Sequence, residues 1–350
     1  MVQRKPIIIR HPIISDISER TVTISPNPNR LILNDELSRK SFDAPTRLKN
    51  ELKESMGEDL YKQLMSTRGI DFDVIDSNTQ DYGPCVPTRE VRSHYHLELE
   101  DGYKDTTPLD QFDKEVLQTC MGAQQYGCPA LSVDMIFRDI AEVENTHIRA
   151  NPPMRQKILE SVRRLMGHKI TIDMTETCER MGYQVPSYPE GRGLGKIESS
   201  ILPGLIWRDA IVNGNLTFDV IKFDRPSPLF VVAQAKKHLL TYAKCLLSIP
   251  NIMNTHQNIM IKNYLMERIM AIRQHPRKII RDKGVGMYPT IKFSDVAHHS
   301  DIDVNNKNQL GRMRRVITKV LDYIIPMEVI KGYTLAKNKG KTVGVHLFFK

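Results

Sequence analysis

The 350-residue sequence predicts an α+β protein in which one order of elements occurs twice: helix, short strand, helix, helix and hairpin. Three observations predict this class. Helix caps followed by apolar stripes at helical spacing recur throughout residues 106–350. Strand-like stretches follow these helices, and Asn213-Gly214-Asn215 between two of them is typical of a tight hairpin turn. Residues 306–350 then show a helix and a hairpin again.

The first copy is expected in residues 106–225. Polar caps, prolines in first turns and a terminating glycine predict three helices there, and the residues concerned are Thr107, Pro108, Gly127, Ser132 and Asn151. Strand-like segments follow at 168–174, 197–212 and 216–223. The insertion at 176–196 is expected to enlarge the hairpin region of this copy.

The second copy is expected in residues 226–350. Ser227 and Pro228 suit the start of a helix, and a long amphipathic helix should cover about 255–273. A strand at 288–293 and a short helix capped by Ser294 then precede the last helix.

In the last helix, apolar residues recur at helical spacing and form one stripe, made of Leu310, Met313, Ile317, Val320, Leu321 and Ile324. Pro326 should end this helix, because proline cannot continue it. Strands at 327–336 and 342–349 flank a basic tip at 337–341, whose Asn338 and Gly340 suit a tight turn.

A helix with a basic face followed by a hairpin with a basic tip is typical of a winged-helix domain, whose helix enters the major groove while the wing contacts phosphates. The sequence therefore predicts DNA-binding residues in both copies. In the second copy they are Lys307, Arg312, Arg315 and Lys319 on the helix, and Lys337, Lys339 and Lys341 on the tip. In the first copy they are Gln156, Lys157, Arg163 and Arg164. A solvated helix packed on an ordinary hairpin would explain the same charges without DNA.

Residues 1–105 are expected to form a partly irregular N-terminal extension. Every clear cap, hairpin signal and amphipathic stripe lies beyond Thr106, so we expect residues 106–350 to fold without this extension.

Composition limits the function classes. A formal net charge of +9 indicates an acidic partner, most simply nucleic acid. The five cysteines form no Cys-x-x-Cys pair, which argues against a zinc ribbon or a disulfide framework and favours thiols in a reducing cytoplasm. No run of about 18 apolar residues predicts a membrane span, and the N-terminal apolar run is broken by Arg10, His11 and Pro12, unlike a signal peptide.

No enzymatic motif is complete. Gly340-Lys341-Thr342 ends like a phosphate-binding loop, but Leu335 stands where that motif needs glycine, and the stretch from Gly191 to Lys196 is one residue short. His94 and His96 alternate around Tyr95, so a strand would place both imidazoles on one face, where they could hold a metal for DNA nicking or lie on a polar surface. We expect no enzyme activity, no cofactor and no metal.

The second copy resembles the C-terminal winged helix of theta-type plasmid replication initiators. The resemblance lies in a long helix containing YLMERI, a helix of the form GRMRRVITKVLDYI, and the segment KGKTVGVHLFF with its Gly-Lys-x-Val turn. The first copy, with TPLDQFDKEVLQTC, RQKILESVRRLM and ITIDMTE, is similar to the N-terminal winged helix of such initiators on Gram-positive mobile elements.

This resemblance implies a cytoplasmic, sequence-specific initiator whose two winged helices bind repeated origin elements in successive major grooves. A host replicative helicase or initiator and a homodimer are the protein partners compatible with it. Two other functions stay open, a winged-helix transcriptional regulator or partition adaptor, and a metal-dependent DNA nickase.

Overall fold

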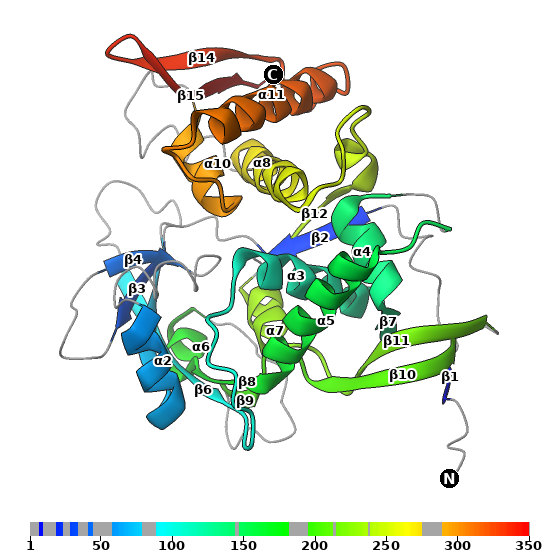
Figure 1. Ribbon diagram of the computed structural model, residues 1–350. Helices are drawn as coiled ribbons and strands as arrows, with labels where there is room; N and C mark the ends of the chain where they lie inside the picture. The colour runs from blue at the N-terminus through cyan, green and yellow to red at the C-terminus, as the bar shows by residue number, and fades with distance from the viewer. Residues whose placement is uncertain are drawn as a thin grey trace. The chain divides into compact units, whose positions relative to one another are not determined.

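The computed structural model describes residues 7–9, 19–23, 29–33, 41–44, 58–78, 89–143, 147–181, 195–212, 215–236, 239–274 and 289–349. It shows an α+β fold, as the sequence predicts, and the chain divides into two compact units (Figure 1). The first consists of Met1–Asp16, Thr21–Phe137 and Arg149–Leu239, and the second of Ile17–Arg20, Arg138–Ile148 and Leu240–Lys350. Within the described ranges, no helix combines the length and apolar character that crossing a membrane requires.

Two sheets organise the first unit. One has six antiparallel strands, in the order β4 (Ser41–Ala44), β3 (Asn29–Leu33), β5 (Ile70–Asn78), β6 (Arg89–Leu99), β8 (His168–Asp173) and β9 (Lys196–Ser200). The other has the order β1 (Ile7–Ile9), β10 (Gly204–Val212), β11 (Asn215–Phe223) and β7 (Ala130–Ser132), with only β1 parallel to its neighbour.

In the described part of this unit the helices are α2 (Glu58–Thr67), α3 (Gln111–Gln125), α4 (Val133–Ala141), α5 (Pro152–Gly167), α6 (Thr175–Met181) and α7 (Pro228–Ala235). The last residues of α4 already belong to the second unit. Asn151 caps α5 as predicted, its side chain accepting a hydrogen bond from the Met154 amide at 2.9 Å. Ser132 likewise accepts from the Met135 amide at the start of α4.

Helix α3 begins three residues later than the sequence predicted. Asp110, not Thr107, is its cap, because Asp110 and Asp113 form a reciprocal capping box. The Asp113 amide donates to Asp110 at 2.9 Å, and the Asp110 amide donates to Asp113 at 2.6 Å. Satisfying two otherwise unpaired amides at once outweighs the single cap that Thr107 offered.

The expected boundary at residue 105 is wrong. Strand β6, from the supposed extension, pairs along its second half with β8, from the supposed first copy. Tyr95 and Leu97 of β6 are buried on the same face as Ile170 and Ile172 of β8. Residues on both sides of 105 therefore share one hydrophobic core, which accounts for their membership of a single unit.

The described part of the second unit contains β12 (Leu239–Ala243), a short 3-10 helix (Lys244–Leu247), α8 (His256–Gln274), β13 (Thr290–Lys292), α10 (Phe293–His299), α11 (Lys307–Ile324), β14 (Gly332–Asn338) and β15 (Lys341–Phe348). Helix α11 packs on α8 and α10, and the β14–β15 hairpin lies beside α11 (Figure 1). Strand β13 adds to this hairpin on the β15 side. The predicted order of helix, strand, helix, helix and hairpin is confirmed here.

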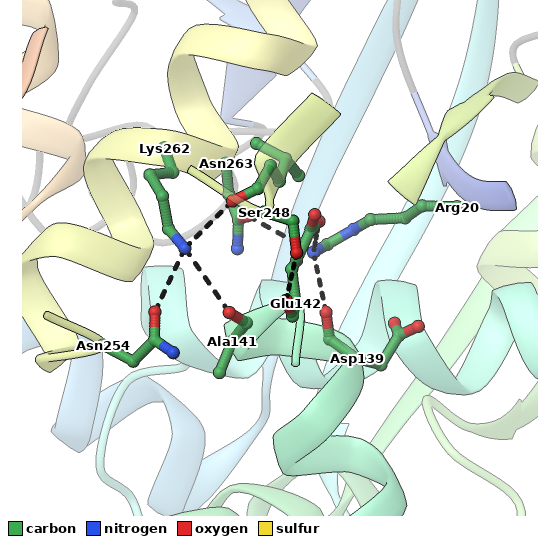
Figure 2. Close-up of polar contacts among 9 residues, drawn as sticks. Arg20, Asp139, Ala141, Glu142, Ser248, Asn254, Lys262 and Asn263 are labelled. Carbon is green, nitrogen blue, oxygen red and sulfur yellow. Dashed lines mark hydrogen bonds and ion pairs between the residues drawn. The ribbon is translucent and has the colours of Figure 1, made fainter. Parts of the chain in front are cut away.

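A buried polar network joins three separate chain segments inside this second unit (Figure 2). Arg20, on β2 (Glu19–Thr23), donates to the Glu142 carboxylate at 3.3 Å, to the Asn263 side chain at 3.3 Å and to the Asp139 carbonyl oxygen at 3.4 Å. The side chains of Arg20 and Glu142 are 1% and 0% exposed. Burial raises the pKa of Glu142 well above its ordinary value, although Arg20 opposes the rise.

Lys262 of α8 completes the network. Its ammonium donates to the carbonyl oxygens of Ala141 and Leu247 at 3.4 and 3.3 Å and to the Asn254 side chain at 3.2 Å (Figure 2). Burial lowers the pKa of Lys262, while the Glu142 carboxyl raises it. Arg20 and Ala141 are therefore both tied to the long helix of the second unit, Arg20 through Asn263 and Ala141 through Lys262.

Candidate nucleic-acid interface

Helix α11 has one apolar face and one exposed polar face. Asn306 caps it, accepting hydrogen bonds from the amides of Asn308 and Gln309 at 3.1 and 3.2 Å. Its buried residues form the stripe that the sequence predicted, namely Met313, Ile317, Val320, Leu321 and Ile324. The helix ends at Ile324, just before Pro326, as expected.

The four basic residues predicted on α11 are all exposed. They are Lys307, Arg312, Arg315 and Lys319. Arg315 donates through Nε to the Gly311 carbonyl oxygen at 3.4 Å, and Lys319 donates to the Asn251 carbonyl oxygen at 3.0 Å. Among the described residues, none of the four forms an ion pair with a carboxylate. Their charge is therefore available to an external anion.

The hairpin tip is a two-residue turn made of Lys339 and Gly340. Their φ angles are +47° and +77°, and Asn338 pairs with Lys341 across the turn. We expected Asn338 to take a turn position, but it ends β14, and a lysine occupies the left-handed conformation instead. A left-handed residue that is not glycine costs free energy, and asparagine tolerates this conformation better than lysine does. Lys337, Lys339 and Lys341 are all exposed.

Most of the chain's net charge is concentrated here. Between Lys307 and Lys341 the sequence has nine lysines and arginines but only two acidic residues, Asp322 and Glu328. Their difference, +7, compares with +9 for all 350 residues. The Asp322 carboxylate accepts a hydrogen bond from the Tyr333 hydroxyl at 2.9 Å, at the end of α11 away from Lys307.

One arginine near this face has a packing role. Arg314, which follows the buried Met313 on α11, lies with its guanidinium over the Phe293 ring at 5.1 Å. This cation–π contact orients Arg314 toward α10 and away from Arg312 and Arg315.

The predicted interface of the first unit is different, because contacts within the unit hold two of its four residues. The Arg164 guanidinium makes a bidentate contact with the Asp113 carboxylate, donating to its two oxygens at 3.2 and 2.7 Å. Lys157 lies 4.7 Å over the Phe112 ring. Gln156 is exposed and donates to Glu160 at 2.7 Å, and Arg163 is exposed.

The Arg164 contact is structural. Burial raises the pKa of the Asp113 carboxyl, Asp110 adds to the rise, and the Arg164 guanidinium opposes it. Without Arg164, Asp113 would be a buried carboxyl with no cation beside it. Another arginine of α5, Arg155, bridges Asp134 and Asp219, each at 2.7 Å. Little basic charge on α5 is thus left for DNA.

The two histidines considered for a metal site lie on β6, on the same sheet face as predicted. His94 contacts Asp73 at 2.5 Å and His96 contacts Asp71 at 2.8 Å, each pair being directly opposite across β5 and β6. Within the described ranges, no three histidine, cysteine or acidic side chains are arranged to hold a metal ion. Cross-strand pairing with aspartate accounts for both histidines.

Two residues of the α11 face were missed by the sequence argument, which considered charge alone. Asn308 and Gly311 are exposed beside Arg312 and Arg315. A Cβ atom added at Gly311 would meet nothing within 4 Å. The signal that could have found both is their helical position, because residues 308, 311, 312 and 315 share one side of a helix.

No family model and no curated protein matches the chain. Two crystal structures of RctB domains 2 and 3, one of them of selenomethionine derivatives, are similar over 80% of this chain and 91% of theirs. The sequence identity is 10% in both cases, with TM-scores of 0.37 and 0.34. Similarity at this level establishes neither the fold nor the function of this chain.

Proposed function

We propose that the chain is a non-enzymatic, sequence-specific double-stranded DNA-binding protein that initiates replication of a plasmid or integrative mobile element. The observation that carries the DNA-binding part is the exposed face of α11 together with the tip of the β14–β15 hairpin, which hold basic side chains unpaired with any described carboxylate. A net charge of +7 within residues 307–341 suits the phosphate backbone of DNA.

The second unit acts as a winged helix in this proposal. An α-helix with its side chains is about 10–12 Å across and the major groove of DNA is about 12 Å wide, so α11 can enter it. The apolar stripe of α11 is covered by its own unit, which leaves Arg312 and Arg315 facing the groove. Lys339 and Lys341, at the end of a two-residue turn, are suited to phosphates, because lysine acts as a point charge.

The first unit contributes less to DNA binding. Its β10–β11 hairpin pairs with β7 and follows α3, α4 and α5, which is the order expected of a winged helix. Between α5 and the hairpin, however, β8, α6 and β9 are inserted, and both strands join the other sheet. With Arg155 and Arg164 held by aspartates, Arg163 and Gln156 are the residues of α5 left to approach DNA.

Initiation is proposed over transcriptional regulation or partition because both copies resemble plasmid initiators in sequence pattern. Repeated origin elements, a host replicative helicase or initiator and a second copy of the chain are the partners this implies. A plasmid that carries the candidate origin but lacks its own initiator should replicate only when the chain is supplied. Regulation of a promoter without replication of that plasmid would favour the regulator.

The DNA-binding part is tested by comparing two variants. Lys339→Ala combined with Lys341→Ala should weaken binding to specific and random DNA alike and reduce the slope of log affinity against log salt by about one unit for each phosphate that is no longer neutralised. Arg315→Ala should weaken binding by about 1–3 kcal/mol on the specific site and by less on random DNA. If the folded double variant kept its affinity and salt slope, these lysines would be solvated surface charges that do not contact DNA.

A further inference from the structure

The outward face of α11 is divided into two halves with different chemistry. In the C-terminal half, the Asn251 carbonyl oxygen engages Lys319 and Tyr333 engages Asp322. In the N-terminal half, Asn308 and Arg312 are exposed, and no hydrogen bond of either side chain to a described residue is found. Within the described part of the chain, Arg315 has only a weak contact, at 3.4 Å, to the Gly311 carbonyl oxygen of its own helix.

Resting on the DNA-binding function proposed above, we infer that Asn308 and Arg312, with Arg315, read bases, whereas Lys319 does not. A carboxamide can pair with both N6 and N7 of adenine, and a guanidinium with both O6 and N7 of guanine. Asn308 therefore specifies an adenine, and the two arginines specify guanines.

The geometry sets how many base pairs are read. Asn308 and Arg315 are seven residues apart, which is about 10 Å along a helix axis at 1.5 Å per residue. Base pairs are about 3.4 Å apart, so the three side chains span about three base-pair steps. The recognised element is a short purine-containing block in the major groove.

Gly311 lies between these side chains and allows the approach. It is exposed within a helix, where glycine is unfavourable, and the space above it is open. Among the residues that the structure describes, no contact requires a glycine there. Close approach of a DNA strand to the helix backbone would explain a glycine at this position, whereas the described contacts within the chain do not.

The test is binding-site selection from a random duplex library by the full chain and by its variants. The wild-type chain should select a block in which one position prefers adenine by about 5- to 100-fold over other bases. Asn308→Ala should abolish that preference while the other positions stay as they are. Asn308→Asp should shift the same position toward cytosine, because a carboxylate accepts from cytosine N4. An acidic residue in the first helical turn also stabilises the helix, so this variant should fold.

Two controls separate base reading from general effects. Asn305→Ala removes an exposed asparagine from the loop before α11, and Lys319→Ala removes a lysine from the other half; neither should change any base preference. If the wild-type chain selects no motif, sequence-specific DNA binding itself fails. If it selects a motif that Asn308→Ala and Asn308→Asp leave unchanged, the base-reading role of Asn308 is overturned while DNA binding stands.

Discussion

Replacing Gly311 by alanine should make the protein more stable and a poorer DNA binder. Glycine inside a helix is less favourable than alanine by about 0.8–1.0 kcal/mol, through greater loss of backbone entropy. The added Cβ would meet nothing within 4 Å, so no steric cost reduces this gain. We therefore expect the free energy of unfolding to rise by about 1 kcal/mol.

The same methyl group would stand on the face that we place against DNA. Overfilling a closely packed contact costs about 1–3 kcal/mol, which corresponds to a fall in affinity of about 5- to 150-fold. Urea denaturation measures the change in the free energy of unfolding, and fluorescence titration with the selected duplex measures the change in affinity. Gly332→Ala is the control, because that position is also open but lies at the start of β14.

An alanine variant that is more stable and binds with unchanged affinity would refute the placement of this helix face against DNA. A variant that is less stable would refute the assignment of open space above Gly311. A rise in stability together with a fall in affinity is expected only if the missing side chain at position 311 serves DNA binding rather than folding.

Three other perturbations test the described contacts. Lys339→Asn should raise stability by up to about 1 kcal/mol, because asparagine tolerates φ of +47°, and should weaken binding to specific and random duplexes alike in titrations. Because burial raises the pKa of Glu142, the folded chain keeps a proton that the unfolded chain releases above its ordinary pKa of 4.5. Stability should therefore fall as pH rises from 4.5 through the folded pKa, by at most about 1.4 kcal/mol per pH unit, and denaturation of Glu142→Gln should lack this contribution. A chain of residues 106–350 should show no cooperative unfolding by circular dichroism, since β8 would lack β6 and Glu142 would lack Arg20; a transition like that of the full chain would contradict the shared sheet.

The parts of the fold that the sequence predicted are those with local signals. Asn151 before two prolines identified the start of α5, and the stripe ending at Ile324 identified α11. The β10–β11 pairing was also predicted, although Asn213 and Gly214 themselves lie outside the described residues. The pairing of β6 with β8 was missed, because no local pattern tells a strand which distant strand it will join.

The same limit applies to the candidate interface. A helical wheel places Lys157 and Arg164 on the polar face of α5, but it cannot show that α3 brings Phe112 and Asp113 beside them. On α11 the charges were predicted and are exposed, whereas Gly311 was overlooked because a position without a side chain gives no chemical signal. Contacts between helices therefore determine which of the predicted basic side chains remain available to contact DNA.

The network around Arg20 has a consequence for how the protein is made. Arg20 and its partner Asn263 are 243 positions apart in the chain. At a synthesis rate of about 5–20 residues per second, an interval of about 12–50 s separates their emergence from the ribosome. Throughout that interval Arg20 lacks the helix that encloses it, and Glu142, which follows Arg20 by 122 positions, lacks it for the second half. The second unit can close only after α8 has been synthesised, so its core needs a residue that is made 243 positions before one of its partners.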